Sequence, residues 1–210
     1  MLLDMPRLYL ITPPLSDFTA FAPLFDATLA ACDIACVLLR TEAHDDGDRK
    51  KIIRALAPIV QAHGAACLIA NEPQLAVRAD ADGVHMEATG ERLKAALSAL
   101  QPNRIVGAGG LTTRDAAMTA GEAGVDYLMF GAPDCVEPHA SIVERVAWWA
   151  EIFNVPCVGY AHDLVGAADL VRAGADFIAL GDAVFSDPRG APAALRDAAA
   201  IVARVGEPAQ

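Results

Sequence analysis

The sequence is poor in lysine and in aromatic residues, and its basic residues form no cluster. Of its 210 residues only Lys50, Lys51 and Lys94 are lysines, 6% are aromatic, and the formal net charge is -11 at pH 7. A surface that binds nucleic acid or an anionic membrane needs clustered Lys and Arg side chains. The composition therefore argues against both partners and favours small molecules.

Long apolar runs and paired cysteines are also missing. No apolar run reaches the length of a membrane span, and the opening segment Met1–Arg7 is too short and too mixed for a signal peptide. The five cysteines are odd in number and include no Cys-x-x-Cys pair, so we expect reduced thiols. These absences predict a cytoplasmic protein without a membrane segment.

A short motif, in which small residues and then an Asp precede a short apolar run, occurs three times. The copies contain Asp82, Asp126 and Asp176, which lie 44 and 50 residues apart. Each copy is typical of a helix that ends in a tight turn before a buried strand begins. Because the spacing corresponds to about two βα units, the repeat predicts a (β/α)8 TIM barrel of the α/β class.

Eight apolar runs support this fold. They are continuous rather than alternating, as in parallel strands that are covered on both faces. Amphipathic stretches between them predict helices, with Thr112 and Asp163 as two of the N-caps. We expect one domain over residues 1–210, with an open flavodoxin-like sheet as the alternative. The predicted strands are Leu8–Ile11, Cys36–Arg40, Ala66–Ala70, Gly83–His85, Ile105–Ala108, Tyr127–Phe130, Cys157–Gly159 and Phe177–Leu180.

Several of these strands and junctions resemble the thiamine phosphate synthase family in order and spacing, over roughly Leu8 to Phe185. The resemblance implies a barrel enzyme of thiamine biosynthesis that joins a pyrimidine methyl diphosphate to a thiazole phosphate and releases pyrophosphate with the help of Mg²⁺. Such chemistry needs cations for the departing pyrophosphate and backbone N–H groups for the thiazole phosphate. The matching segments are Leu8–Thr12, Val37–Arg40, Leu68–Asn71, Ala81–His85, Val125–Tyr127 and Ala173–Asp176.

Four residues at or just after the ends of the second, third and fourth strands match or replace family site residues. Arg40 and Asn71 stand at the family's Arg and Asn, so the resemblance implies that both bind substrate and that Arg40 is catalytic. Glu72 replaces a metal-ligand Asp. The second metal carboxylate is absent from its aligned place, and Glu87 is the candidate that replaces it.

Other family positions differ further along the chain. Leu38 and Glu42 stand where the family has Gln and Lys, and Gly109 stands where it has Ser. His162 replaces a glycine and would place a polar ring in the pocket, so we expect it to bind substrate. Gly131 and Gly181, which follow the sixth and eighth strands, are further candidates for substrate binding.

A purely structural interpretation is also open for Arg40, Asn71 and His85. Arg40 could pair with Glu42 or Glu72, and Asn71 could bond loop backbone. His85 is more typical of a hydrogen-bonded core histidine than of an acid–base group.

The replaced ligands leave two alternatives to the synthase reaction. One is a noncatalytic or regulatory paralogue, and the other is a related barrel enzyme with a different small substrate. In each case the expected partner is a small molecule. For the synthase reaction, this small molecule is phosphorylated. Trp148 and Trp149 cannot both face the core of one helix, so one is either partly exposed or marks an interface in a homo-oligomer.

Overall fold

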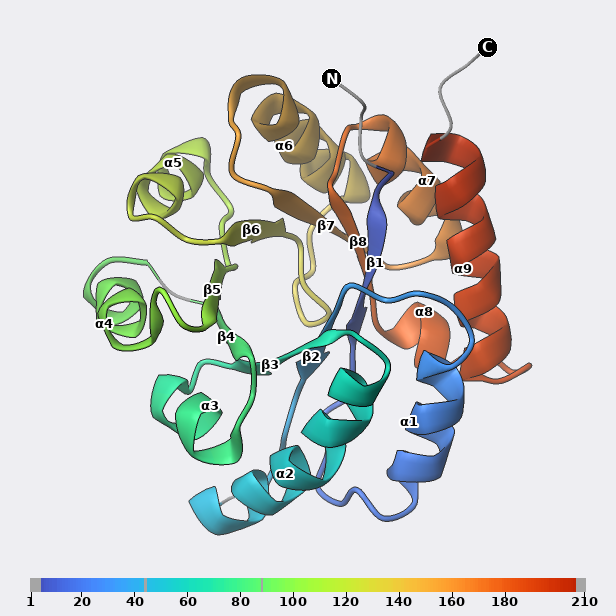
Figure 1. The fold of residues 1–210 in the computed structure, drawn as a ribbon. Helices are drawn as coiled ribbons and strands as arrows, with labels where there is room; N and C mark the ends of the chain where they lie inside the picture. Colours follow the sequence, from blue (N-terminus) through green and yellow to red (C-terminus); the bar gives the residue numbers. More distant parts are fainter. Residues whose placement is uncertain (1–4, 44, 88, 207–210) are drawn as a thin grey trace.

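Eight parallel strands close into a barrel in the order β1 to β8, and helices surround it (Figure 1). The computed structural model describes residues 5–43, 45–87 and 89–206, so the first four residues of the opening segment lie outside the described residues. The chain thus has the predicted (β/α)8 fold. The strands are β1 (Arg7–Ile11), β2 (Cys36–Leu39), β3 (Ala66–Ala70), β4 (Gly83–Met86), β5 (Ile105–Ala108), β6 (Tyr127–Phe130), β7 (Cys157–Ala161) and β8 (Phe177–Leu180). The helices are α1 (Phe21–Leu29), α2 (Asp46–Ala62), α3 (Pro73–Ala79), α4 (Glu91–Leu100), α5 (Arg114–Glu122), α6 (His139–Ile152), α7 (Leu164–Arg172), α8 (Asp182–Phe185) and α9 (Ala191–Gly206).

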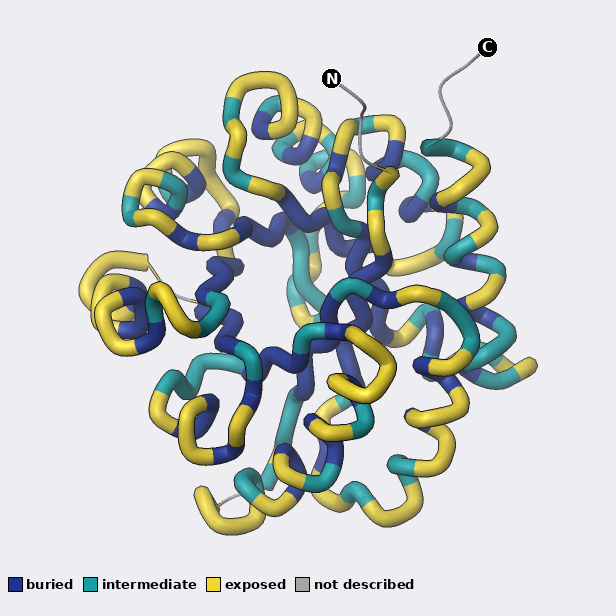
Figure 2. Tube along the Cα trace, viewed as in Figure 1, coloured by how far each residue is buried: buried dark blue, intermediate teal, exposed yellow. Residues whose placement is uncertain are grey.

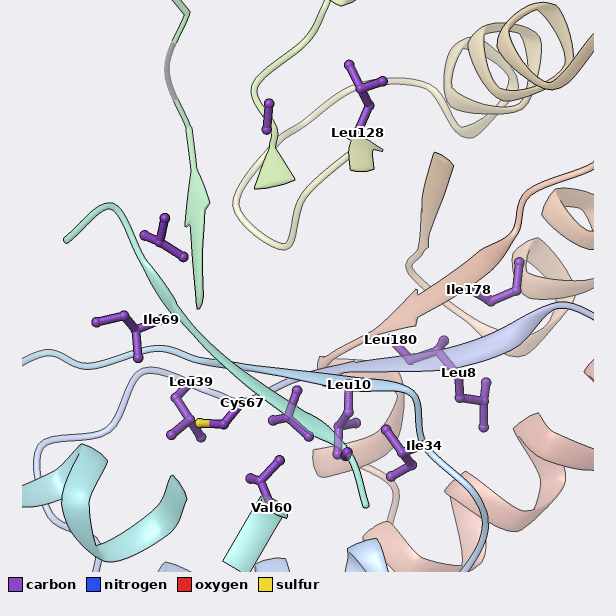
Figure 3. Close-up of a cluster of buried hydrophobic side chains, with 14 of the residues drawn as sticks. Leu8, Leu10, Ile34, Leu39, Val60, Cys67, Ile69, Leu128, Ile178 and Leu180 are labelled. Atoms are coloured by element: carbon purple, nitrogen blue, oxygen red, sulfur yellow. The ribbon is translucent and has the colours of Figure 1, made fainter. Parts of the chain in front are cut away.

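The strands are buried on both faces, as continuous apolar runs require. The larger core lies between strands and helices, where Val60 of α2 covers Leu39 of β2 and Cys67 of β3 (Figure 3). The outward helix faces are exposed (Figure 2). Trp149 is buried and Trp148 is partly buried. Among the described helices, none is long and apolar enough to cross a membrane.

Two predicted helix starts have different outcomes. Asp163 caps α7, and its carboxylate accepts a hydrogen bond from the Gly166 N–H. The prediction for α5 was wrong by one residue, because Thr113 rather than Thr112 is the cap. Thr113 has the extended backbone of a cap residue and lies three residues before Ala116, whose N–H its hydroxyl accepts.

The repeated Asp joins neighbouring strands at the end of the barrel where the strands begin. Each carboxylate accepts a hydrogen bond from a backbone N–H at the start of the preceding strand. The pairs are Asp82 with Cys67 at 2.7 Å, Asp126 with Val106 at 2.8 Å, and Asp176 with Cys157 at 2.7 Å. Between β1 and β2 the corresponding residue is Ala35, whose side chain has no acceptor and whose backbone N–H donates to the Leu8 carbonyl at 2.9 Å. The motif is therefore structural, and it links β3 to β4, β5 to β6 and β7 to β8.

We expect Asp126→Ala to lower the free energy of unfolding by about 1–3 kcal/mol, because the Val106 N–H loses its side-chain acceptor. Asp126→Asn keeps an acceptor oxygen and should lose less. The control is Asp33→Ala, which removes an ion pair to Arg7 from a side chain that is 77% exposed and should cost no more than about 1 kcal/mol. Urea unfolding measures all three variants, and equal losses at positions 126 and 33 would contradict the role of the motif.

The interior of the barrel contains a polar chain among apolar side chains. The His85 Nδ1 lies 2.8 Å from the Tyr127 hydroxyl, which lies 2.9 Å from the Tyr9 hydroxyl. Burial lowers the pKa of His85 to about 4 and raises the pKa of each tyrosine. All three groups are therefore neutral at pH 7, and His85 is the hydrogen-bonded core histidine that the sequence favours.

The lowered pKa of His85 predicts acid sensitivity of the fold. Below pH 6.5 the unfolded chain binds a proton at His85 that the folded protein does not bind until about pH 4. The free energy of unfolding should therefore fall over this interval, by about 3 kcal/mol in total. His85→Gln should lack this part of the decrease. Urea unfolding at pH 7, 5.5 and 4 checks the prediction, and the same pH dependence in both proteins would refute it.

Candidate active site

A cavity of about 380 Å³ opens at the end of the barrel where the strands end. This size suits a small ligand, and in barrels of this type the active site lies at this face. The cavity brings together Arg40, Asn71, Glu72 and Glu87, which follow β2, β3 and β4. Four of the seven predicted site residues therefore share one cavity.

Arg40 is held at the mouth from both sides. Its backbone N–H donates to the Thr12 hydroxyl at 3.0 Å, which ties the end of β2 to the loop after β1. Its guanidinium forms an ion pair with Asp134, which belongs to the loop after β6. The expectation that Arg40 pairs with Glu42 or Glu72 is wrong, because Asp134 reaches across the mouth.

Asn71 bonds the backbone of the neighbouring loop, as its structural interpretation predicts. Its Oδ1 accepts a hydrogen bond from the Glu87 N–H at 2.8 Å, and its own N–H donates to the His85 carbonyl at 2.9 Å. Its φ of 60° is left-handed, a conformation that Asn tolerates better than most residues. Asn71 thereby fixes the backbone from which Glu87 projects.

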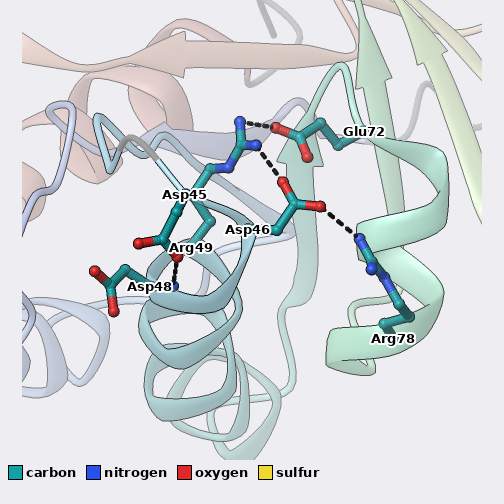
Figure 4. A network of polar contacts seen from close by, with 6 residues as sticks. All are labelled: Asp45, Asp46, Asp48, Arg49, Glu72 and Arg78. Carbon is teal, nitrogen blue, oxygen red and sulfur yellow. Dashed lines mark hydrogen bonds and ion pairs between the residues drawn. The ribbon is translucent and has the colours of Figure 1, made fainter.

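Glu72 is oriented by a cation that sequence reasoning missed. Its Oε1 accepts a hydrogen bond from Arg49 of α2 at 2.5 Å. Arg49 also bonds Asp46, whose other oxygen accepts from Arg78 at 3.2 Å (Figure 4). The network joins α2, the loop after β3 and α3. Arg49 gives no signal in the sequence because it lies on a helix and not directly after a strand.

The cavity has an excess of negative charge. Glu42, Glu72, Glu87 and Asp134 line it, and Arg40 is the one Lys or Arg side chain among its described lining residues. None of the three lysines lines it. An anionic ligand would therefore need further cations, such as metal ions, to lie in this cavity.

The carboxylates fit a metal ion that is shared with a ligand. Within the described ranges, there is no group of three or more Asp, Glu, His or Cys side chains that could hold a metal ion. Glu72 and Glu87 nevertheless both line the cavity. Mg²⁺ is commonly bound by one or two carboxylates together with phosphate oxygens and water. The donor set thus fits Mg²⁺ bound jointly with a phosphorylated ligand.

The other three predicted site residues lie after β6, β7 and β8 and do not line this cavity. His162 is exposed, and its ring packs edge-on against Tyr160 with centroids 4.9 Å apart. Gly131 has a φ of 81°, and a Cβ there would lie 2.7 Å from a side chain of α6. A Cβ at Gly181 would lie 3.3 Å from the Tyr160 hydroxyl. These residues form the opposite side of the barrel mouth.

Comparison with known proteins agrees with this architecture. A family model described as "Thiamine monophosphate synthase" matches residues 8–184. The chain is 40% identical over 196 residues to a thiamine-phosphate synthase of Rhodospirillum centenum, covering 91% of this chain and 95% of that one. It is 36% identical over 200 residues to a thiamine-phosphate synthase of Hyphomonas neptunium, covering 90% of each.

A solved structure shows the same fold. The thiamine phosphate pyrophosphorylase from Pyrococcus furiosus superimposes with a TM-score of 0.82 at 22% identity, covering 98% of this chain and 99% of that one. Family match, sequence identity and fold all agree. The chain belongs to the thiamine monophosphate synthase family.

Proposed function

We propose that this protein joins a pyrimidine methyl diphosphate to a thiazole phosphate and releases pyrophosphate, as a thiamine phosphate synthase. The observation that carries the proposal is the convergence of Arg40, Glu72 and Glu87 on one cavity at the barrel mouth of a member of this family. We further propose that residues 1–210 form one domain and that the protein acts in the cytoplasm, on the basis of its sequence.

Arg40 is the residue that binds the diphosphate. The bond that breaks joins the pyrimidine methyl carbon to a diphosphate oxygen, so negative charge grows on the leaving group. A guanidinium that donates to those oxygens stabilises this charge, the more so because the Arg40 side chain is only 20% exposed. In the free protein the Asp134 carboxylate forms an ion pair with this guanidinium, and the bound diphosphate takes the place of that carboxylate.

Glu72 and Glu87 are the residues that would hold Mg²⁺. When bound, the ion neutralises charge on the diphosphate. A direct hydrogen bond from Arg49 fixes the orientation of the Glu72 carboxylate, and Asn71 fixes the backbone of Glu87. This arrangement also explains how a cavity rich in carboxylates accepts an anionic substrate.

The thiazole phosphate is assigned to the other side of the mouth. Gly131, His162 and Gly181 follow three adjacent strands, β6, β7 and β8. A glycine has no side chain to cover the backbone at the strand end, and His162 adds an exposed ring. The substrates would then meet over the centre of the barrel.

The excess of carboxylates supports the two alternatives to the synthase reaction. A mouth with four acidic side chains and a single Arg favours a ligand that is less anionic than a diphosphate. A noncatalytic or regulatory paralogue, or a barrel enzyme with a different small substrate, would fit that preference. Turnover with the two synthase substrates separates the proposals.

Purified protein should form thiamine phosphate from both substrates and Mg²⁺. Arg40→Ala should lower kcat by about a hundredfold or more, because a donor to the leaving group is lost. Asp134→Asn removes the competing carboxylate and should lower the KM for the diphosphate. Product formation followed by chromatography tests all three. A folded wild-type protein without product would favour the alternative, and an Arg40→Ala variant with normal kcat would remove Arg40 from the mechanism.

The metal assignment predicts altered Mg²⁺ dependence. Glu72→Gln and Glu87→Gln should each raise the Mg²⁺ concentration for half-maximal rate by about tenfold or more, because a charged ligand is lost. Glu42→Gln is the matched control, since Glu42 lines the same cavity but is not assigned to the metal. Rate measurements over a Mg²⁺ series test this. A shift at position 42 alone would contradict the assignment.

A further inference from the structure

His85 has a second ring nitrogen that faces the mouth cavity. The residue is 2% exposed and lines the floor of the cavity. Its Nδ1 contacts Tyr127, whereas its Nε2 has no hydrogen-bond partner in the described part of the chain. Nε2 is also not among the fully buried polar atoms that lack a partner, which are on Arg49, His139 and Arg145. The cavity is therefore the route by which Nε2 can be reached.

Gly109 leaves the space that this ring occupies. A Cβ at position 109 would lie 2.4 Å from the His85 Nε2 and 2.9 Å from its Cε1. Real Cβ atoms do not approach other atoms so closely, so any side chain at position 109 would displace the ring. The glycine directly after β5 thus allows Nε2 to stay beside the cavity.

The polar chain inside the barrel determines which ring nitrogen carries the proton. If Tyr9 donates to Tyr127 and Tyr127 donates to the His85 Nδ1, both hydroxyl protons are used and Nε2 carries the hydrogen. The reverse direction would leave the Tyr9 proton only the Cys36 sulfur, a weak acceptor. A buried donor without a good acceptor is unfavourable, so the first direction prevails.

We propose that the Nε2–H of His85 donates a hydrogen bond to a ring nitrogen of the pyrimidine substrate, and that Tyr127 is the positioning residue that holds the imidazole in this state. The proposal rests on the proposed function. Ile11, Leu38 and Met129 also line the cavity, and such apolar side chains suit the faces of an aromatic ring. A floor with one neutral donor fits a heteroaromatic ring, whereas the charged groups at the rim fit the diphosphate.

Binding of two separate probes tests the proposal without turnover. Calorimetry measures how tightly the protein binds each of the two probes. One probe is the pyrimidine methyl alcohol, which has no diphosphate leaving group, and the other is pyrophosphate with Mg²⁺. His85→Leu should weaken binding of the alcohol by about tenfold and leave binding of pyrophosphate unchanged. His85→Gln should restore most of the affinity, because its amide N–H can take the place of Nε2–H. Tyr127→Phe should weaken binding of the alcohol alone.

Nitrogen NMR of the free protein gives a readout that is independent of ligand. The His85 signals should show the Nε2–H form in the wild type and a mixture of forms in Tyr127→Phe. Gly109→Ala keeps both hydroxyls but moves the ring, and it provides the same selective test if Tyr127→Phe does not fold.

The outcomes separate the two proposals. A wild-type protein that binds both probes, with His85→Leu binding the alcohol equally well, would overturn the role of His85 alone. The Nδ1–H form in the wild type would do the same. A folded wild-type protein that binds neither probe would overturn the proposed function itself.

Discussion

Closure of eight parallel strands into one barrel is the constraint on which the rest of this structure depends. Because all strands run in the same direction, their ends converge on one mouth, and residues far apart in the sequence become neighbours there. The opposite end is tied by Asp82, Asp126 and Asp176, each of which bonds the start of the preceding strand. The chain thereby separates a stabilising end from an end that is free to carry chemistry.

Acidic side chains outnumber basic ones at the mouth of the barrel. Arg40 faces four carboxylates, and one of them, Asp134, holds it in an ion pair. A substrate with two phosphates must therefore compete with a protein carboxylate and bring or recruit cations. In the function we propose, Glu72 and Glu87 would hold Mg²⁺ together with the substrate and so offset this excess of acid. The proposed mechanism follows from this balance.

The fold was predictable because its signals are local. Continuous apolar runs and the Asp motif depend on a few neighbouring residues, and they located all eight strands. Arg40, Asn71, Glu72 and Glu87 were predictable as cavity residues because strand ends converge. Their partners were not: Asp134 lies 94 residues from Arg40, and Arg49 lies 23 residues from Glu72 on a helix. Which side chains meet across a barrel depends on loop paths, and sequence periodicity does not encode them.

We propose that the mouth cavity binds the diphosphate through Arg40 and the two glutamates. A crystal structure of the protein with pyrophosphate and Mg²⁺ tests it most directly. We expect pyrophosphate on the Arg40 guanidinium, Asp134 turned away, and Mg²⁺ held by Glu72 and Glu87. Pyrophosphate bound elsewhere on the barrel, with the Arg40 to Asp134 ion pair intact, would contradict it.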